Sequence, residues 1–136
     1  MKPLLYGLIA AAAALSLSAC QSNAPPPPQA ASGKSASLRS MERVATAAYK
    51  CWFESKDPAF RGYSFANELN SFSGTPRFLL VPKRNFGGKP LLVVQAEGGS
   101  SHVDMFGPLM SEPVGSRIRA DVGRWQTGDA SCGAAA

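Results

Sequence analysis

The chain has 136 residues, a formal net charge of +5 and a hydrophobic fraction of 45%. It holds three cysteines and one histidine without a Cys-x-x-Cys pair, which excludes the common cysteine–histidine zinc sites, so we expect no metal and no cofactor. Once a targeting segment is removed, the remaining length suits one small domain.

The N-terminus has the pattern of a signal peptide. Lys2 is followed by an uncharged run rich in Leu and Ala that extends to Ala19. The apolar centre of this run, residues 4–15, is shorter than the roughly 20 residues that a helix needs to cross a bilayer. The order of a positive residue, a short apolar region and small residues therefore predicts a cleaved signal peptide over residues 1–19 rather than a permanent transmembrane helix.

The apolar run ends in Leu17-Ser18-Ala19-Cys20, which resembles the lipobox of bacterial lipoproteins: an aliphatic residue, two small residues and a cysteine. The resemblance covers the first 20 residues only. It implies that the Cys20 thiol receives a diacylglyceryl group and that a peptidase cuts the chain just before this residue. Two or more acyl chains anchor a protein stably, whereas a single chain gives only marginal binding. The alternatives are a secretory signal with a chance cysteine and a buried N-terminal helix.

Residues 20–37 are predicted to form a lipidated, proline-rich tether. Gln21, rather than an Asp, follows the cysteine, which by resemblance to enterobacterial lipoproteins implies the outer membrane, with the domain facing the periplasm. Prolines fill positions 25–28 and bulky apolar residues are nearly absent, so this segment cannot bury a core. Its composition favours extended polyproline II with a flexible Gly/Ser end, which indicates a spacer. A proline-rich ligand for a partner is the alternative.

Residues 38–136 regain bulky apolar residues and are predicted to form one small α+β domain, marginal in size for an unaided core. With Cys20 committed to lipid, Cys51 and Cys132 remain. An even pair of cysteines in an oxidising compartment indicates a disulfide. Closing this long loop would stabilise the fold by about 4 kcal/mol in the chain-entropy model. The alternative is that one of the two cysteines is a free nucleophile or a metal ligand.

The N-terminal element of the domain is predicted to be a helix over residues 38–54. Apolar side chains recur there at three- and four-residue steps, and Cys51 lies on this inward stripe. The disulfide would then clip the helix to a C-terminal strand over residues 115–125, where Arg117, Arg119 and Asp121 alternate with apolar residues.

Strands and turns are predicted for the rest of the domain. Apolar, β-rich runs at residues 77–83 and 90–96 flank a glycine-containing turn, which indicates a hairpin, and residues 102–106 would pair back. Residues 63–69 are compatible with an irregular strand or a short turn of helix. Short connections require antiparallel pairing. The predicted fold is α+β, with the N-terminal helix packed on an antiparallel sheet of about four strands.

The candidate binding residues are basic and aromatic side chains at the hairpin tip and on the last predicted strand. They are Lys83, Arg84, Phe86, Lys89, Arg117 and Arg119. Each basic residue near an anionic surface contributes about 1 kcal/mol before screening, so such groups suit an anionic partner. The alternative is that these charges only solubilise the domain and blunt the edges of its sheet.

One local group of residues could carry chemistry, namely Ser100, Ser101, His102 and Asp104. A nucleophile, a base and an orienting acid usually arrive from separate elements, whereas these residues are adjacent in the chain. The carboxylates elsewhere show no spacing typical of an acid/base pair. We therefore assign no catalytic residue and expect no enzyme.

Two functional classes follow from these features. The first is a membrane-anchored binding or structural lipoprotein of the cell envelope, such as a partner-protein adaptor, assembly factor, inhibitor or exclusion-type protein. Its partners would be the membrane, through the lipid, and an envelope protein or anionic envelope polymer, and not nucleic acid. The alternative is a small envelope hydrolase or peptidoglycan-active enzyme. A concave pocket with convergent polar groups around His102 would favour the enzyme.

Overall fold

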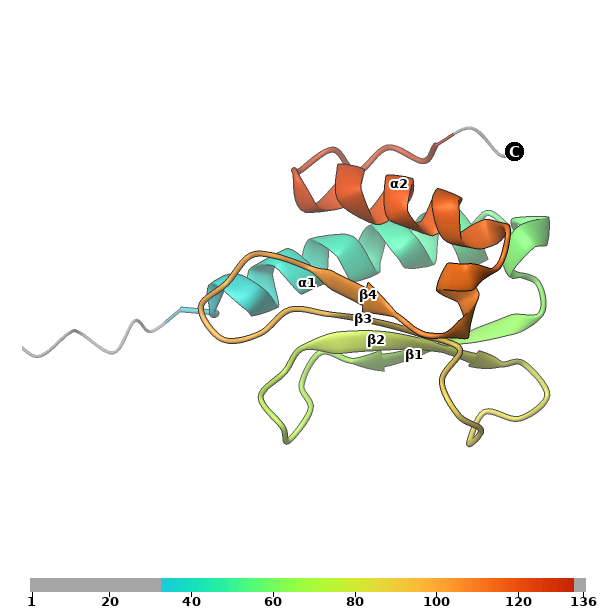
Figure 1. Ribbon diagram of the computed structural model, residues 1–136. Helices are drawn as coiled ribbons and strands as arrows, with labels where there is room; N and C mark the ends of the chain where they lie inside the picture. The colour runs from blue at the N-terminus through green and yellow to red at the C-terminus, as the bar shows by residue number, and fades with distance from the viewer. Residues whose placement is uncertain (1–32, 134–136) are drawn as a thin grey trace, which may run out of the picture. The chain divides into compact units, whose positions relative to one another are not determined.

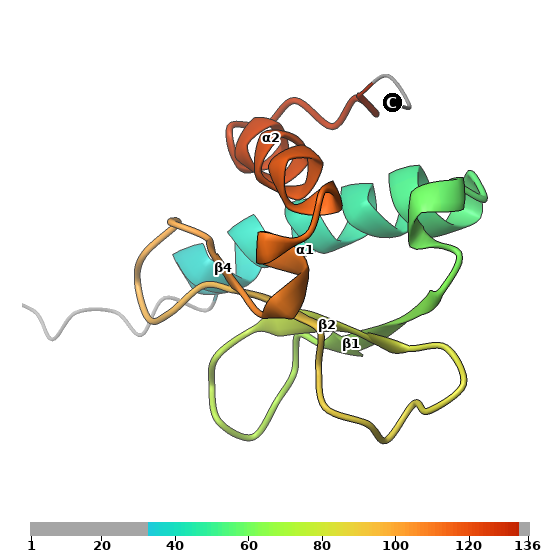
Figure 2. The same cartoon turned by 45° about the vertical axis from the view of Figure 1, so that its right-hand side comes forward.

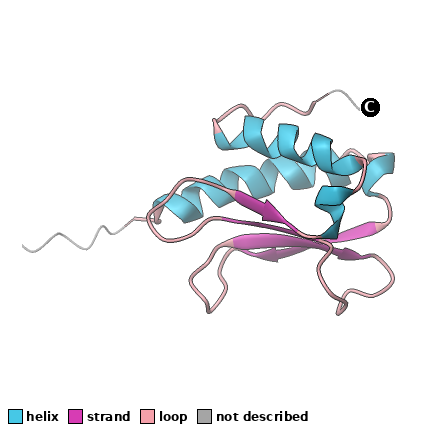
Figure 3. Ribbon diagram, in the orientation of Figure 1, coloured by secondary structure: helices cyan, strands magenta, loops and turns pink. Residues whose placement is uncertain are grey.

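The computed structural model describes residues 33–133, in which two helices lie on one side of a four-stranded antiparallel sheet (Figures 1 and 3). The predicted signal peptide, the predicted lipidation site Cys20 and most of the predicted tether lie outside the described residues. The α+β architecture predicted from the sequence is confirmed, with one disulfide and a sheet of four strands.

The first helix forms where the three- and four-residue spacing predicted it. Helix α1 spans Ala36–Ala48 and continues without a break into the π-helix η1, Tyr49–Glu54. At its start the Ser35 hydroxyl accepts a hydrogen bond from the backbone N–H of Leu38 at 3.1 Å, which satisfies one of the free N–H groups of the first turn. The helix thus begins two residues earlier than residue 38, and its last six residues wind more widely than an α-helix.

The sheet is a simple meander. Its strands, in the spatial order β1-β2-β3-β4, are β1 (Tyr63–Glu68), β2 (Arg77–Pro82), β3 (Leu92–Gln95) and β4 (Asp104–Phe106). All neighbours pair antiparallel, as the short connections require. The predicted hairpin between β2 and β3 is confirmed, and the segment that the sequence left open is a strand, β1, at the edge of the sheet.

Only one face of the sheet is covered by helices. Phe78 and Leu80 on β2 and Leu92 and Val94 on β3 are completely buried in the core on the side of α1. Two of the three connections between strands, residues 69–76 and 83–91, project to the other side of the sheet (Figures 1 and 2). Phe72 and Phe86 lie in these two connections and both side chains are exposed.

The prediction of a C-terminal strand was wrong, because the segment is helix α2, Val114–Gln126. Alternation over a few residues fits a strand, but Ile118, Val122 and Trp125 also recur at the three- and four-residue steps of a helix, and all three are buried. Asp121 faces the interior too, although its polarity suggested a solvent-facing position. The alternation of polar and apolar residues was therefore a weaker signal than the apolar stripe at helical spacing. A short 3-10 helix, η3 (Pro108–Ser111), precedes α2.

An aromatic cluster joins the helices to the sheet. Trp52 on η1 stacks on Phe60 with ring centroids 4.4 Å apart, and it also packs against Trp125 at 5.1 Å and Phe78 at 6.3 Å. Phe60 ends the short 3-10 helix η2, Pro58–Phe60. Trp52 thus contacts residues from η2, β2 and α2, so its ring lies at the centre of the core.

The predicted disulfide between Cys51 and Cys132 is confirmed. The two Cα atoms are 5.3 Å apart, inside the 4.4 to 6.8 Å range that such a bond usually requires. The bond joins η1 to the segment that follows α2, and not to a strand as the sequence suggested. It closes a loop across a sequence separation of 81, which includes all four strands and both turns of 3-10 helix.

Candidate functional site

A cavity of about 400 Å³ opens where the end of η1, the helix η2 and the start of the β2–β3 loop meet. Three basic residues contribute to its lining: Lys56, Arg61 and Lys83. The other residues of the lining are mostly aromatic, namely Trp52, Phe53, Asp57, Phe60 and Tyr63. We call this cavity the basic pocket.

The register of the sheet brings the three basic residues together. Tyr63 at the start of β1 lies opposite Pro82 at the end of β2, and the backbone N–H of Lys83 donates to the carbonyl of Gly62 at 2.9 Å. Arg61 therefore lies beside Lys83, although the two are far apart in sequence. Arg84, the next residue, lies against Arg61 and Lys83 in a neighbouring hollow.

Among residues 33–133, the three cations of the basic pocket have no ion-pair partner. Each residue is exposed, so its charge is solvated in the absence of a ligand. Elsewhere, Lys34 is paired with Glu42 at 2.7 Å and Arg77 with Glu68 at 2.5 Å, whereas Arg84 and Lys89, like the pocket cations, have no ion-pair partner among the described residues. The pocket thus concentrates positive charge that the protein itself does not neutralise.

Lys56 has a strained backbone. Its φ is 59°, in the left-handed region, and it is the one residue other than glycine with a positive φ in the described part of the chain. Its N–H donates to the carbonyl of Phe53 at 2.9 Å, an arrangement that ends helices and in which glycine is the usual residue. A side chain at this position costs roughly 1–2 kcal/mol, and such strain clusters at functional sites.

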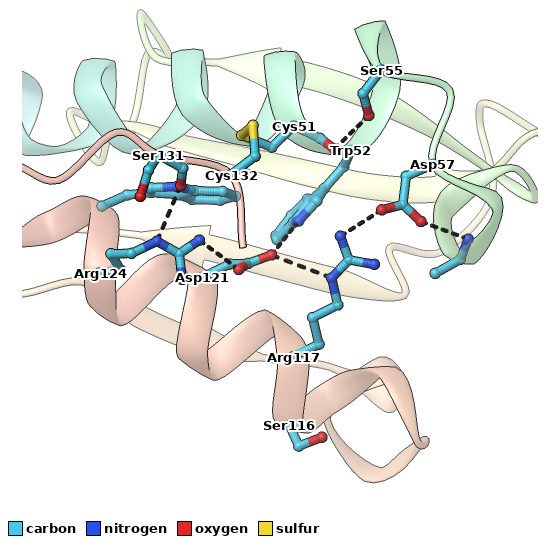
Figure 4. Close-up of polar contacts among 12 residues, drawn as sticks. Cys51, Trp52, Ser55, Asp57, Ser116, Arg117, Asp121, Arg124, Ser131 and Cys132 are labelled. Carbon is cyan, nitrogen blue, oxygen red and sulfur yellow. Dashed lines mark hydrogen bonds and ion pairs between the residues drawn. A yellow bond between two sulfur atoms is a disulfide. The ribbon is translucent and has the colours of Figure 1, made fainter. Parts of the chain in front are cut away.

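The single carboxylate of the pocket lining, Asp57, is neutralised by Arg117, which does not itself line the pocket (Figure 4). Asp57 is 7% exposed, and its oxygens accept hydrogen bonds from Arg117 Nη2 at 2.5 Å and from the N–H of Ala59 at 2.9 Å. The hydrogen bond from Arg117 lowers the pKa of Asp57 from its ordinary value; burial opposes this shift and the Ala59 N–H adds to it. Asp57 is therefore ionised at neutral pH, and Arg117 cancels its charge.

Arg117 belongs to a buried polar network that also includes Asp121 and Arg124 on α2 (Figure 4). Asp121 is 2% exposed and accepts hydrogen bonds from Trp52 Nε1 at 2.8 Å and from Arg124 Nη2 at 2.7 Å. The Nε atom of Arg117 lies 3.5 Å from the Asp121 carboxylate. The hydrogen bond to Asp57 raises the pKa of Arg117 further above its ordinary value. This network fixes α2 against η1 and η2.

The structure brings together four of the six predicted binding residues. Lys83, Arg84, Phe86 and Lys89 lie on the single loop between β2 and β3, and all four are exposed. Phe86 is 62% exposed. We call residues 84–89 of this loop the hairpin tip.

The other two predicted residues lie elsewhere, on α2. Arg117 is held in the buried network, and Arg119 is exposed and donates to the carbonyl of Met110 at 3.0 Å. On the predicted strand Arg117 and Arg119 would have shared one face, but the segment is helix α2, and residues two apart on a helix do not face each other. Sequence reasoning missed Lys56 and Arg61, since only the pairing of β1 with β2 places them beside Lys83.

His102 lies on the surface. Its side chain is 71% exposed, and its Nε2 is 3.3 Å from Asp104 Oδ1, whose side chain is 57% exposed. The Ser100 hydroxyl accepts a hydrogen bond from the backbone N–H of His102, and the Ser101 carbonyl accepts one from Ser40. Within residues 33–133 no three His, Cys, Asp or Glu side chains gather as a metal site would need, and no helix has the length and apolarity for a membrane span.

Comparisons with protein-family models, with curated proteins and with solved structures give no match for this chain.

Proposed function

We propose that this protein is a lipid-anchored lipoprotein of the cell envelope whose domain is a binding module for a partner protein with an acidic surface. The observation that carries the proposal is the hairpin tip, where the exposed Phe86 lies on the same short loop as Arg84 and Lys89, two cations with no ion-pair partner among residues 33–133. Aromatic and arginine side chains dominate the energetics of protein interfaces, because they bury a large area or make forked hydrogen bonds. An apolar ring favours a protein partner over a purely polyanionic polymer.

The disulfide supports a location outside the cytoplasm. Bonds such as Cys51–Cys132 persist in oxidising compartments and are rare where thiols are kept reduced. This agrees with the signal-peptide pattern and the lipobox resemblance of the first 20 residues. In this proposal the lipid holds the protein at the outer membrane, the proline-rich tether sets its distance from the surface, and the hairpin tip is free to engage the partner.

The anchor is tested by changing the cysteine of the lipobox. In cells given a radiolabelled fatty acid, the wild-type protein should incorporate label, and the Cys20→Ser variant should incorporate none, because the thiol is the acceptor. The variant should also keep its signal peptide, since the peptidase acts after lipidation. The Cys51→Ala variant, which retains Cys20, serves as the control. Label in the Cys20→Ser protein would refute the anchor.

The hairpin tip is tested by capturing crosslinked partners from intact cells. We expect Phe86→Ala and Arg84→Ala each to reduce capture about 30-fold, the effect of losing an interface anchor of about 2 kcal/mol. The melting temperature should not change, since both side chains are exposed and contribute little to the core. Binding and not folding would then be lost.

Phe72→Ala is the matched control for this experiment, because Phe72 is also an exposed ring, in the connection between β1 and β2. It should leave capture unchanged, as should His102→Ala. The alternative, a small envelope hydrolase, would require the opposite result. If His102→Ala abolished function in a stable, correctly localised protein while Phe86→Ala had no effect, the binding-module proposal would fail.

A further inference from the structure

We infer that the basic pocket is a binding site for a phosphate monoester, carried either by a soluble sugar phosphate or by a lipid headgroup. This site is separate from the hairpin tip and goes beyond the proposed function. Its cations come from three segments of the chain: Lys56 follows η1, Arg61 follows η2, and Lys83 begins the β2–β3 loop. The fold thus places three donors around one cavity of about 400 Å³.

The charge of the cavity favours an anion. The lining contains three cations and one carboxylate, Asp57, and that carboxylate is ion-paired with Arg117 at 2.5 Å. Because Arg117 cancels Asp57, no carboxylate in the described part of the chain compensates the three cations. Aromatic side chains from the core, Trp52 and Phe60, line the cavity together with these cations.

The number of donors favours a phosphate monoester over a carboxylate. A carboxylate has two oxygens and can be satisfied by one arginine, whereas a phosphate monoester carries a charge of about −1.5 to −2 at neutral pH and three acceptor oxygens. Lys56, Arg61 and Lys83 can each donate to a different oxygen. The apolar floor formed by Phe53 and Tyr63, both partly exposed, would contact the organic part of the ligand.

Lys56 has a positive φ at a position where glycine is the usual residue. Glycine at this position would relieve the strain of the positive φ. The lysine side chain gains no packing that would offset this strain, because Lys56 is exposed. The strained residue is one of the three cations that line the cavity. A binding role for the ammonium group accounts for a lysine where the backbone favours glycine.

The experiment measures affinity by titration calorimetry with the full-length protein in a non-ionic detergent at neutral pH and low ionic strength. The probes are glucose 6-phosphate, glucose 6-sulfate and glucose. Glucose 6-phosphate should bind about tenfold more tightly than the sulfate, which has one charge fewer, and glucose should show no measurable binding. Short-chain dihexanoyl phosphatidate forms the lipid arm, and tighter binding of this probe than of glucose 6-phosphate would identify a lipid headgroup as the source.

Two variants assign the binding to the pocket. Arg61→Gln and Lys56→Gly should each weaken binding of the phosphorylated probe about tenfold. Lys56→Gly should also keep or raise the melting temperature, because it removes the strain, so its loss of affinity cannot be attributed to unfolding. Lys50→Gln is the control, since Lys50 is an exposed lysine on η1 and does not line the cavity.

The inference is overturned if glucose 6-phosphate and dihexanoyl phosphatidate bind no more tightly than glucose, or if Lys56→Gly and Arg61→Gln leave their affinity unchanged. Failure here is distinguishable from failure of the proposed function. Partner capture is measured with changes at Phe86 and Arg84, and neither residue lines the basic pocket.

Discussion

The Arg117→Ala variant is expected to lose about 3–5 kcal/mol of its free energy of unfolding, the usual cost of removing one member of a buried ion pair. The side chain of Arg117 is 15% exposed, and its removal leaves Asp57 and Asp121 buried with less compensation. Urea denaturation followed by circular dichroism at neutral pH measures this loss. Arg119→Ala is the matched control: this exposed arginine lies on the same helix, and its loss should change stability by at most about 0.5 kcal/mol.

The effect of Arg117→Ala should depend on pH in a defined direction. In the wild-type protein the pKa of Asp57 is lowered, so the stabilisation linked to it is present above the pKa of the unfolded chain, about 3.9, and is lost as pH falls through the lower folded-state pKa. The difference in free energy of unfolding between wild type and variant should therefore become smaller as the pH falls below the pKa of the unfolded chain. A difference that stayed constant from neutral pH into acid would show that Asp57 is not the partner that matters.

Removal of the disulfide is the second change with a large expected effect. The double variant Cys51→Ala, Cys132→Ala should be less stable by up to about 4 kcal/mol, because the unfolded chain regains the entropy that the closed loop removes. Since small domains are stable by only about 5–15 kcal/mol, this is a large share of the total. Reduction of the wild-type protein with dithiothreitol should lower its urea denaturation midpoint to about that of the double variant. The double variant should not respond to the reductant, and an unchanged wild-type midpoint would contradict the prediction.

The elements that the sequence predicted correctly are those with one consistent period over their whole length. Helix α1 has an apolar stripe at helical spacing, and the β2–β3 hairpin has two apolar runs around glycines, so both were found. Helix α2 was missed because its residues fit two periods: Arg117 and Arg119 alternate with apolar neighbours, while Ile118 and Val122 lie four apart. The buried Asp121 made the alternation look regular, and only its partners in the folded state explain its position.

The candidate sites differ in the same way. The hairpin tip could be predicted because Arg84, Phe86 and Lys89 are close together in the sequence. The basic pocket could not, because Lys56 and Arg61 join Lys83 only through the register of β1 against β2 and the end of η1. The pairing of Tyr63 with Pro82 would have indicated that Arg61 lies beside Lys83. The sequence did not establish that residues 63–69 form a strand, so this pairing could not be predicted.

The position of the disulfide also determines what a protease can do to this domain. Residues 69–76 and 83–91 are the two connections that project away from the helices, and exposed loop tips are preferred sites of cleavage. Both connections lie between Cys51 and Cys132. A single cut in either one therefore leaves two fragments covalently joined, which migrate as one band on a gel until they are reduced. A nicked copy of the domain would stay in one piece, and its strands could remain paired.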